Sequence, residues 1–295
     1  MQLQIEGLSK RYPGGTQALQ DVSLSIPQGM FGLLGPNGAG KSTLMRTLAT
    51  LQEADTGSAT LDGVDVLRQK DEVRKLLGYL PQEFGLYPKV TAETLLTHFA
   101  ELKGIENSKE RRDVVQALLR QTNLWDHRNK PLGSFSGGMK QRFGIAQALL
   151  GNPRLIIVDE PTAGLDPEER VRFHNLLSAI GENVVVILST HIVSDVSDLC
   201  RQMAIIHQGR VHATGEPAAL VAQLDGRVWR KPIDRSQVAD YQQRFQVISM
   251  HLFGGRNVVH VLHDELPEPG FEPVTPGLED LYFATIKGFT LGAAN

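Results

Sequence analysis

The sequence lacks the long hydrophobic runs that a transmembrane helix requires. Its most apolar stretches, such as Met30–Leu34, Leu155–Val158 and Val184–Leu188, have only four or five residues, whereas a helix that crosses a bilayer needs about 20. The first ten residues also lack the charged and then apolar pattern of a secretory signal. We therefore expect any role at a membrane to depend on a partner protein.

Cysteine and net charge are equally scarce. Cys200 is the only cysteine among 295 residues, which excludes an internal disulfide and agrees with a reducing, cytosolic compartment. The formal net charge is -3 and no polybasic segment is present. The composition therefore gives no sign of binding to nucleic acid or to an anionic membrane surface. A chain of this length can bury a sizeable core in one or two domains.

One glycine-rich stretch fits the pattern of a phosphate-binding loop, and it reads Gly35-Pro36-Asn37-Gly38-Ala39-Gly40-Lys41-Ser42-Thr43. It follows an expected strand, Met30–Leu34, and precedes an expected helix, Thr43–Leu51, which is the context that the motif needs. Backbone N–H groups and the helix start would face a triphosphate. Lys41 would contact the β- and γ-phosphates, and the Ser42 hydroxyl would ligate Mg²⁺. The alternative is an ordinary glycine turn before a helix.

Polar side chains follow three other predicted strands. Gln82 ends the strand Leu76–Pro81, Asp159 and Glu160 end the apolar run Leu155–Val158, and His191 follows the strand 183–189. Ligands bind at the carboxyl ends of strands in open α/β sheets. Successive strand residues point to opposite faces, so we assign Asp159 to Mg²⁺ and Glu160 to the attacking water. Taken singly, Gln82 also fits a polar strand edge, His191 a structural role, and the acidic pair a solvated strand end.

A second helix start of the anion-binding kind is Ser136-Gly137-Gly138, before an expected helix that reaches Leu150. One chain needs only one phosphate cradle. The second start therefore suggests that two chains meet head to tail across two nucleotides, and a flexible hinge with a capped helix is the alternative. Tyr12 lies in a turn, where it is either a platform for adenine or the cap of a small core.

The remaining pattern predicts the surrounding elements. Alternating residues at Leu3–Ile5 and Val22–Ile26 predict antiparallel strands, and 91–121 predicts helices with Thr91 as a simple cap. The tail is predicted as strands at 226–233, 247–253 and 258–263, a hairpin turn at 254–257, helices at 236–245 and 278–286, and a proline-rich connector at 267–276.

In this order the motifs resemble those of ATP-binding-cassette (ABC) ATPases, the nucleotide-binding subunits of transporters. Gly35–Thr43 resembles Walker A, Gln82 the Q-loop glutamine, Leu155–Glu160 Walker B with the catalytic glutamate, Ala163–Asp166 the D-loop, His191 the switch histidine and Tyr12 the adenine-stacking aromatic. Phe135–Met139 resembles the signature, although Phe135 replaces the usual Leu and Met139 the usual Gln. The resemblance covers about residues 1–224.

The resemblance implies an α/β fold, with a P-loop ABC ATPase core over residues 1–224. This core would combine a mixed sheet, an antiparallel β subdomain and a helical insertion at about 84–150. A small α+β accessory domain would follow at 225–295. The implied catalytic residues are Glu160, His191, Gln82 and Lys41, and the implied Mg²⁺ ligands are Ser42, Gln82 and Asp159. The implied ATP-binding residues are Tyr12, Gly35, Pro36, Asn37, Gly38, Ala39, Gly40, Lys41, Ser42, Thr43, Ser136, Gly137, Gly138 and Asp166.

The stretch 82–93 is similar to bacterial export-type cassettes, which pair as dimers and drive a separate permease from the cytoplasmic face of the membrane. Phe84, Leu86 and Tyr87 would then form an apolar docking patch beside the helical insertion. A soluble cassette acting on the ribosome or on nucleic acid is the alternative. The single motif set, the negative net charge and the missing heptad run argue against it. Glu160 and His191 argue against an adaptor that senses nucleotide without turnover.

Overall fold

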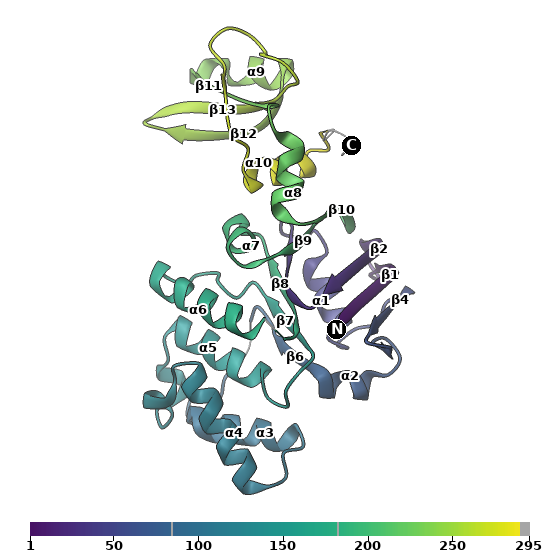
Figure 1. Cartoon of the computed structure of the whole chain (residues 1–295), viewed down its shortest axis with the longest axis vertical. Helices are drawn as coiled ribbons and strands as arrows, with labels where there is room; N and C mark the ends of the chain where they lie inside the picture. Colours follow the sequence, from purple (N-terminus) through teal and green to yellow (C-terminus); the bar gives the residue numbers. More distant parts are fainter. Residues whose placement is uncertain (84, 182, 290–295) are drawn as a thin grey trace.

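The computed structural model describes residues 1–83, 85–181 and 183–289. Figure 1 shows an elongated molecule with a bundle of helices at one end, a central body of two sheets, and a third sheet at the other end. No helix in these described ranges combines the length and the hydropathy needed to cross a membrane.

The first sheet is antiparallel and has the strand order β2-β1-β4-β5. Its strands are β1 (Gln2–Arg11), β2 (Gln17–Pro27), β4 (Thr56–Leu61) and β5 (Val64–Asp65). Ile5 lies opposite Leu24 on one side and Ala59 on the other, and all three side chains are buried. The alternation read from the sequence therefore places one face of this sheet against the core.

The central sheet is mixed, because five parallel strands carry one antiparallel edge strand. In spatial order the strands are β10 (Arg210–Gly215), β9 (Gln202–His207), β3 (Gly29–Leu34), β8 (Val185–Thr190), β7 (Leu155–Asp159) and β6 (Leu77–Leu80). Strands β7 and β8 are buried at every position, as expected for a sheet covered on both faces. The carboxyl ends of β3, β7 and β8 therefore meet at one edge.

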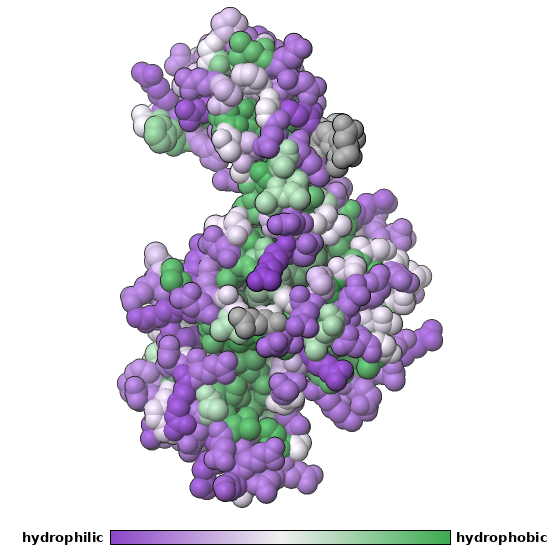
Figure 2. All heavy atoms as spheres, viewed as in Figure 1, coloured by the Kyte–Doolittle hydropathy of each residue, from purple (hydrophilic) through white to green (hydrophobic). Residues whose placement is uncertain are grey.

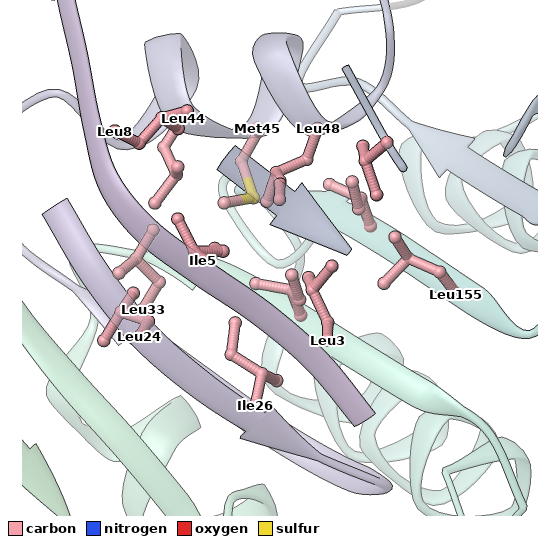
Figure 3. Close-up of a cluster of buried hydrophobic side chains, with 14 of the residues drawn as sticks. Leu3, Ile5, Leu8, Leu24, Ile26, Leu33, Leu44, Met45, Leu48 and Leu155 are labelled. Atoms are coloured by element: carbon pink, nitrogen blue, oxygen red, sulfur yellow. The ribbon is translucent and has the colours of Figure 1, made fainter. Parts of the chain in front are cut away.

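Two hydrophobic clusters hold this body together. Figure 3 shows the first, in which α1 (Lys41–Leu48) packs Leu44, Met45 and Leu48 between the antiparallel sheet and the parallel strands. The second covers the opposite face of the central sheet with α6 (Pro167–Ile180) and α7 (Val193–Leu199). Two short helices complete this region, α2 (Lys70–Leu76) and α8 (Pro217–Val221).

The expected helical insertion is present as α3 (Ala92–Leu102), α4 (Ser108–Gln121) and α5 (Gly137–Ala148). Thr91 caps α3 by accepting a hydrogen bond from the Thr94 amide at 3.3 Å, as the sequence predicts. Short 3₁₀ turns at Trp125–His127 and Leu132–Ser134 lead into α5. Phe84, one of the three residues of the predicted docking patch, lies outside the described residues.

The C-terminal part differs from the expectation at two points. Its antiparallel sheet has the order β12-β13-β11-β14, so a fourth strand, β14 (Glu272–Pro273), forms inside the predicted connector. The turn between β12 (Gln246–Phe253) and β13 (Arg256–Leu262) is only Gly254–Gly255, and both glycines have positive φ. The other elements are β11 (Val228–Ile233), α9 (Val238–Arg244), α10 (Leu278–Ile286) and 3₁₀ turns at Ala222–Leu224 and Arg235–Gln237.

Candidate functional site

The phosphate-loop motif forms a tight turn between β3 and α1. Gly40 precedes α1 with φ 107°, and a Cβ added to it would stand 2.4 Å from the Ala18 carbonyl oxygen. A Cβ on Gly35 would stand 2.3 Å from the Ile206 carbonyl oxygen. Both positions therefore require glycine, one for its dihedral angles and both for space. This close packing fixes the loop, whose residues 36–43 line the cavity described below.

Lys41 is the buried cation of this loop. Its Nζ donates hydrogen bonds to the carbonyl oxygens of Gly35 (2.6 Å) and Pro36 (3.2 Å) and lies 3.4 Å from Glu160 Oε1. The side chain is only 5% exposed. The ammonium group thus stands between the loop that would hold phosphate and the carboxylate proposed for the water.

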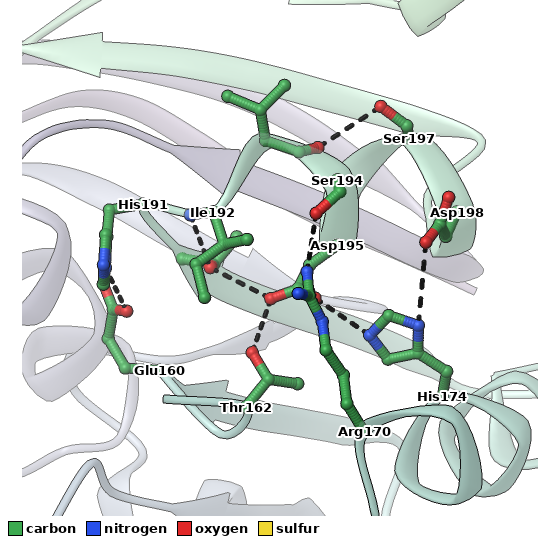
Figure 4. A network of polar contacts seen from close by, with 12 residues as sticks. Glu160, Thr162, Arg170, His174, His191, Ile192, Ser194, Asp195, Ser197 and Asp198 are labelled. Atoms are coloured by element: carbon green, nitrogen blue, oxygen red, sulfur yellow. Dashed lines mark hydrogen bonds and ion pairs between the residues drawn. The ribbon is translucent and has the colours of Figure 1, made fainter. Parts of the chain in front are cut away.

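Glu160 follows β7 in the left-handed region, with φ 51°. Its amide donates to the Ser189 carbonyl at 2.8 Å, which ties the end of β7 to β8. The second carboxylate oxygen, Oε2, lies 2.5 Å from His191 Nδ1, as Figure 4 shows. A non-glycine residue at positive φ is costly and is found often at functional sites. The turn aims the carboxylate at both Lys41 and His191.

Asp159 is buried beside this pair. Burial raises the pKa of its carboxyl, and the hydroxyls of Ser189 and Ser42 act in the opposite direction. Its Oδ1 has no hydrogen-bond partner among the described residues, and buried polar atoms rarely stay unpaired. No group of three or more His, Cys, Asp and Glu in those residues is arranged as a metal site. One carboxylate with neutral oxygen atoms and phosphates is the donor set that suits Mg²⁺, so these residues fit that ion.

A cavity of about 490 Å³ joins most of the predicted site residues. Tyr12 lies at its rim, 38% exposed, with its hydroxyl 3.2 Å from Thr43 Oγ1 and 3.1 Å from Gln52 Oε1. Gln52 was not predicted, and its polar residue type gives no signal in the sequence. The predicted residues that line the cavity are Tyr12, Pro36, Asn37, Gly38, Ala39, Gly40, Lys41, Ser42, Thr43, Gln82 and Glu160.

The second helix start lies elsewhere. Ser136 and Gly137 are exposed and do not line the cavity, and Ser136 caps α5 by accepting from the Met139 amide at 3.2 Å. Phe135 is buried in the core of the helical insertion, and Met139 packs against that core. The two residues that depart from the usual signature, Phe135 and Met139, therefore contribute to the packing of the helical insertion. Asp166 likewise caps α6, accepting from the Glu169 amide at 2.8 Å, and stays outside the cavity.

Sequence reasoning missed one polar cluster. Asp195 on α7 is fully buried and accepts hydrogen bonds from Thr162, Thr190, Arg170 and His174 (Figure 4). These residues come from three separate segments, and none belongs to a recognisable motif. The only available signal was an acidic residue near the start of a short helix, between Ser194 and Val196.

Comparison with known proteins gives consistent findings. The family described as "ABC transporter" matches residues 19–163. The chain is 33% identical to the probable multidrug ABC transporter ATP-binding protein YbhF of Escherichia coli, over 96% of this chain and 52% of that protein. It therefore spans about half the length of that relative. The chain is also 32% identical to the uncharacterized ABC transporter ATP-binding protein YxlF of Bacillus subtilis, over 96% of this chain and 99% of that one.

A third relative is the linearmycin resistance ATP-binding protein LnrL of Bacillus subtilis, 34% identical over 76% of this chain and 72% of that protein. Among solved structures, an ATP-binding cassette seen as a dimer in a post-hydrolysis state with ADP and Pi matches with TM-score 0.66 and 27% identity. That match covers 72% of this chain and 98% of the other. An ATP-binding subunit of an ABC transporter matches with TM-score 0.67 and 30% identity, over 76% and 93% of the two chains.

Proposed function

The chain belongs to the ABC transporter family as an ATP-binding, ATP-hydrolysing cassette, and we propose that two copies close over two ATP molecules to drive a separate membrane permease. One observation carries this proposal. At the Ser136 helix start, Ser136 and Gly137 are exposed, Gly138 is buried, and all three stand apart from the chain's own nucleotide cavity, so the exposed end of this helix is open to a nucleotide held by another chain. The match to a cassette solved as a dimer supports the same arrangement.

Each proposed pocket takes Walker A from one chain and Ser136-Gly137-Gly138 from the other. Lys41 and the loop amides of residues 35–43 bind the phosphates, and Tyr12 stacks on adenine. Asp166 begins α6 at an exposed loop, where it contacts the opposite pocket. Removing the γ-phosphate takes away charge that bridges the two chains, and the dimer opens.

Glu160 is the proposed base for the attacking water. Lys41 at 3.4 Å and His191 at 2.5 Å hold its carboxylate in place, and His191 stabilises charge on the transferred phosphoryl group. Ser42, Gln82 and Asp159 would hold Mg²⁺, which neutralises charge on the β- and γ-phosphates when bound.

An apolar groove supports docking of a permease. The groove, of about 490 Å³, lies where α3 and α5 face the segment after α1, α2 and β6. Leu51 and Leu102 line it and are 57% and 71% exposed. Figure 2 shows hydrophobic residues gathered along the middle of the lower half of the molecule, between hydrophilic flanks. Exposed apolar surface of this kind marks interaction sites. Tyr87, from the predicted docking patch, is 64% exposed.

Export is the proposed direction of transport, with the chain held at the cytoplasmic face of the membrane through its permease. Two relatives support export by their names, since YbhF is named as a probable multidrug transporter protein and LnrL as a linearmycin resistance protein. We also propose that residues 1–224 are the catalytic domain and 225–295 an accessory domain. The hydrophobic cluster that joins α10 to α7 and the central sheet would fix the two together.

The Glu160→Gln variant tests the mechanism. We expect it to bind ATP and to dimerise, while ATP hydrolysis falls by about 100-fold or more because the general base is lost. Glu168→Gln, an exposed glutamate at the start of α6, is the matched control and should hydrolyse ATP normally. Hydrolysis by Glu160→Gln at the wild-type rate would show that its assigned role is wrong.

Adding Gly137→Asp to Glu160→Gln tests the composite pocket. No described atom lies within 4 Å of a Cβ added at Gly137, so the variant should fold, while its charge repels a phosphate offered by the partner chain. We expect ATP binding without ATP-dependent dimers in size-exclusion chromatography, and Gly137→Asn should still dimerise. Dimers of the Asp variant equal to those of the Asn variant would contradict the pocket.

The permease proposal needs its own experiment. From detergent extracts the chain should co-purify with a multispanning membrane protein, and Leu102→Glu should weaken that recovery without changing the ATPase activity of the isolated chain. Recovery of ribosomes or DNA instead would favour the alternative, a soluble cassette.

A further inference from the structure

Asp195 is a buried aspartate near the catalytic edge whose carboxylate has four hydrogen-bonding residues as partners. It is 0% exposed, and both carboxylate oxygens have partners. Oδ1 lies 2.6 Å from an Arg170 guanidinium nitrogen and 2.9 Å from His174 Nε2. Oδ2 accepts from the Thr162 hydroxyl at 2.5 Å and the Thr190 hydroxyl at 3.3 Å. Figure 4 shows the carboxylate at the centre of these side chains.

The two threonines stand beside the proposed catalytic pair, Thr162 in the loop after β7 and Thr190 as the last residue of β8. Thr162 is two residues after Glu160, and Thr190 directly precedes His191. The Thr190 hydroxyl also accepts from the Ile192 amide at 3.0 Å, which closes the chain around His191. One carboxylate oxygen therefore ties the loop after β7, near Glu160, to the end of β8, directly before His191.

Helix α6 anchors the carboxylate from the other side. Arg170 supplies a positive charge to Oδ1, and its terminal nitrogen also contacts Ser194 Oγ at 2.6 Å. His174 lies between Asp195 and Asp198. A buried carboxylate that is paired and fully hydrogen-bonded is held rigidly, because every departure leaves a charge unsatisfied. The Asp195 carboxylate therefore has one fixed position relative to α6.

We propose that Asp195 is a positioning residue for ATP hydrolysis, which fixes the Glu160–His191 pair through Thr162 and Thr190. The Asp195 carboxylate has no hydrogen bond to either catalytic side chain, so it acts through Thr162 and Thr190, the residues that it holds. The pair itself is close, at 2.5 Å, and Glu160 lies in a backbone conformation that only its surroundings maintain. Displacing a catalytic group by 1 Å costs about 10²-fold in rate. This inference rests on the proposed roles of Glu160 and His191.

The Asp195→Asn variant tests the inference in the full-length chain. We expect kcat for ATP hydrolysis to fall by about 10- to 100-fold with KM for ATP within about twofold of wild type, because the phosphate loop is untouched. Asp198→Asn is the matched control, since Asp198 lies on the same helix, is 60% exposed and contacts only the far side of His174 at 3.9 Å. Asp198→Asn should keep the wild-type kcat. Equal kcat values for the two variants, or a change in KM alone, would overturn the inference.

A double-mutant cycle separates positioning from general loss of structure. In a His191→Ala background, Asp195→Asn should lower kcat much less than in wild type, because the group it positions is already gone. Thr162→Val, which keeps the shape but removes the hydroxyl, should lower kcat with a wild-type melting temperature, and it serves if Asp195→Asn folds poorly. Multiplicative effects in the cycle, or full activity of Thr162→Val, would overturn the inference. Normal turnover by Glu160→Gln would instead remove its premise.

Discussion

Asp159 and Asp195 are both buried aspartates beside the carboxyl ends of the central strands, and their surroundings are opposite. Asp195 has both oxygens occupied by side chains of its own chain. Asp159 has an Oδ1 without a partner in the described part of the chain, and burial raises the pKa of its carboxyl. The first environment stabilises a negative charge, and the second leaves it incompletely compensated.

This difference distinguishes a carboxylate that stabilises the fold from one that is available to bind a ligand. A satisfied carboxylate contributes to the native state by itself and fixes its neighbours. An unsatisfied one costs stability until something outside the chain completes it, which is the usual condition of a ligand site. Substitution of each aspartate by asparagine removes charge at nearly constant shape, so the two variants should respond in opposite ways.

The largest expected effect is on the stability of Asp195→Asn. Losing this charge removes the buried partner of Arg170, whose side chain is 29% exposed, and of His174, so we expect a loss toward the lower end of the about 3–5 kcal/mol that breaking a buried pair from one side costs. Urea denaturation of the nucleotide-free protein measures this as a lower free energy of unfolding. Asp159→Asn, measured beside it, should show no such loss. If both variants lose the same free energy, the contrast between the two environments is wrong.

The next effect is on turnover. Asp159→Asn should lower Mg²⁺-dependent ATP hydrolysis by about 100-fold, or about 2.7 kcal/mol in the barrier, because a charged group that organises the phosphates is lost. Steady-state ATPase assays over a range of Mg²⁺ concentrations measure this loss. A rate within about twofold of wild type at every Mg²⁺ concentration would show that Oδ1 is not held for the ion.

The contrast also marks what the sequence can predict. Asp159 stands at the end of four consecutive apolar residues. This apolar run predicts a buried strand, and the end of that strand predicts the ligand-binding edge. Walker A could be predicted equally well, because its geometry depends on glycines that lie close together in the sequence. Strands β7 and β8 also lie close to their predicted positions, since apolar runs determine them locally.

Asp195 could not be found in that way. Its partners lie in the loop after β7, at the end of β8 and on α6, up to 33 residues away, and only the tertiary fold brings them together. The same holds for β14, a two-residue strand in a proline-rich stretch. Its pairing of Pro273 with Trp229 places proline at a sheet edge, where a missing N–H is tolerated. Tertiary packing determines contacts of this kind, and local sequence patterns do not predict them.

The smallest expected effect is the pH dependence of stability that Asp159 causes. Its folded-state pKa is raised above the unfolded value, chiefly by burial, so the folded chain binds the extra proton more tightly than the unfolded chain. Stability from this group is therefore present below the unfolded pKa of about 4 and is lost as the pH rises through the folded pKa. Asp159→Asn removes this dependence.

In nucleotide-free protein without Mg²⁺, the melting temperature of Asp159→Asn should therefore exceed that of wild type at pH 8. The difference should shrink as the pH is lowered toward 4, because the wild-type carboxyl then becomes protonated and resembles the amide. Adding Mg²⁺ with a non-hydrolysable ATP analogue should reverse the order at pH 8, since only the wild type gains a ligand for its unpaired oxygen. If the difference in melting temperature did not change with pH, its cause would be packing and not the charge of Asp159. The contrast between Asp159 and Asp195 would then be wrong.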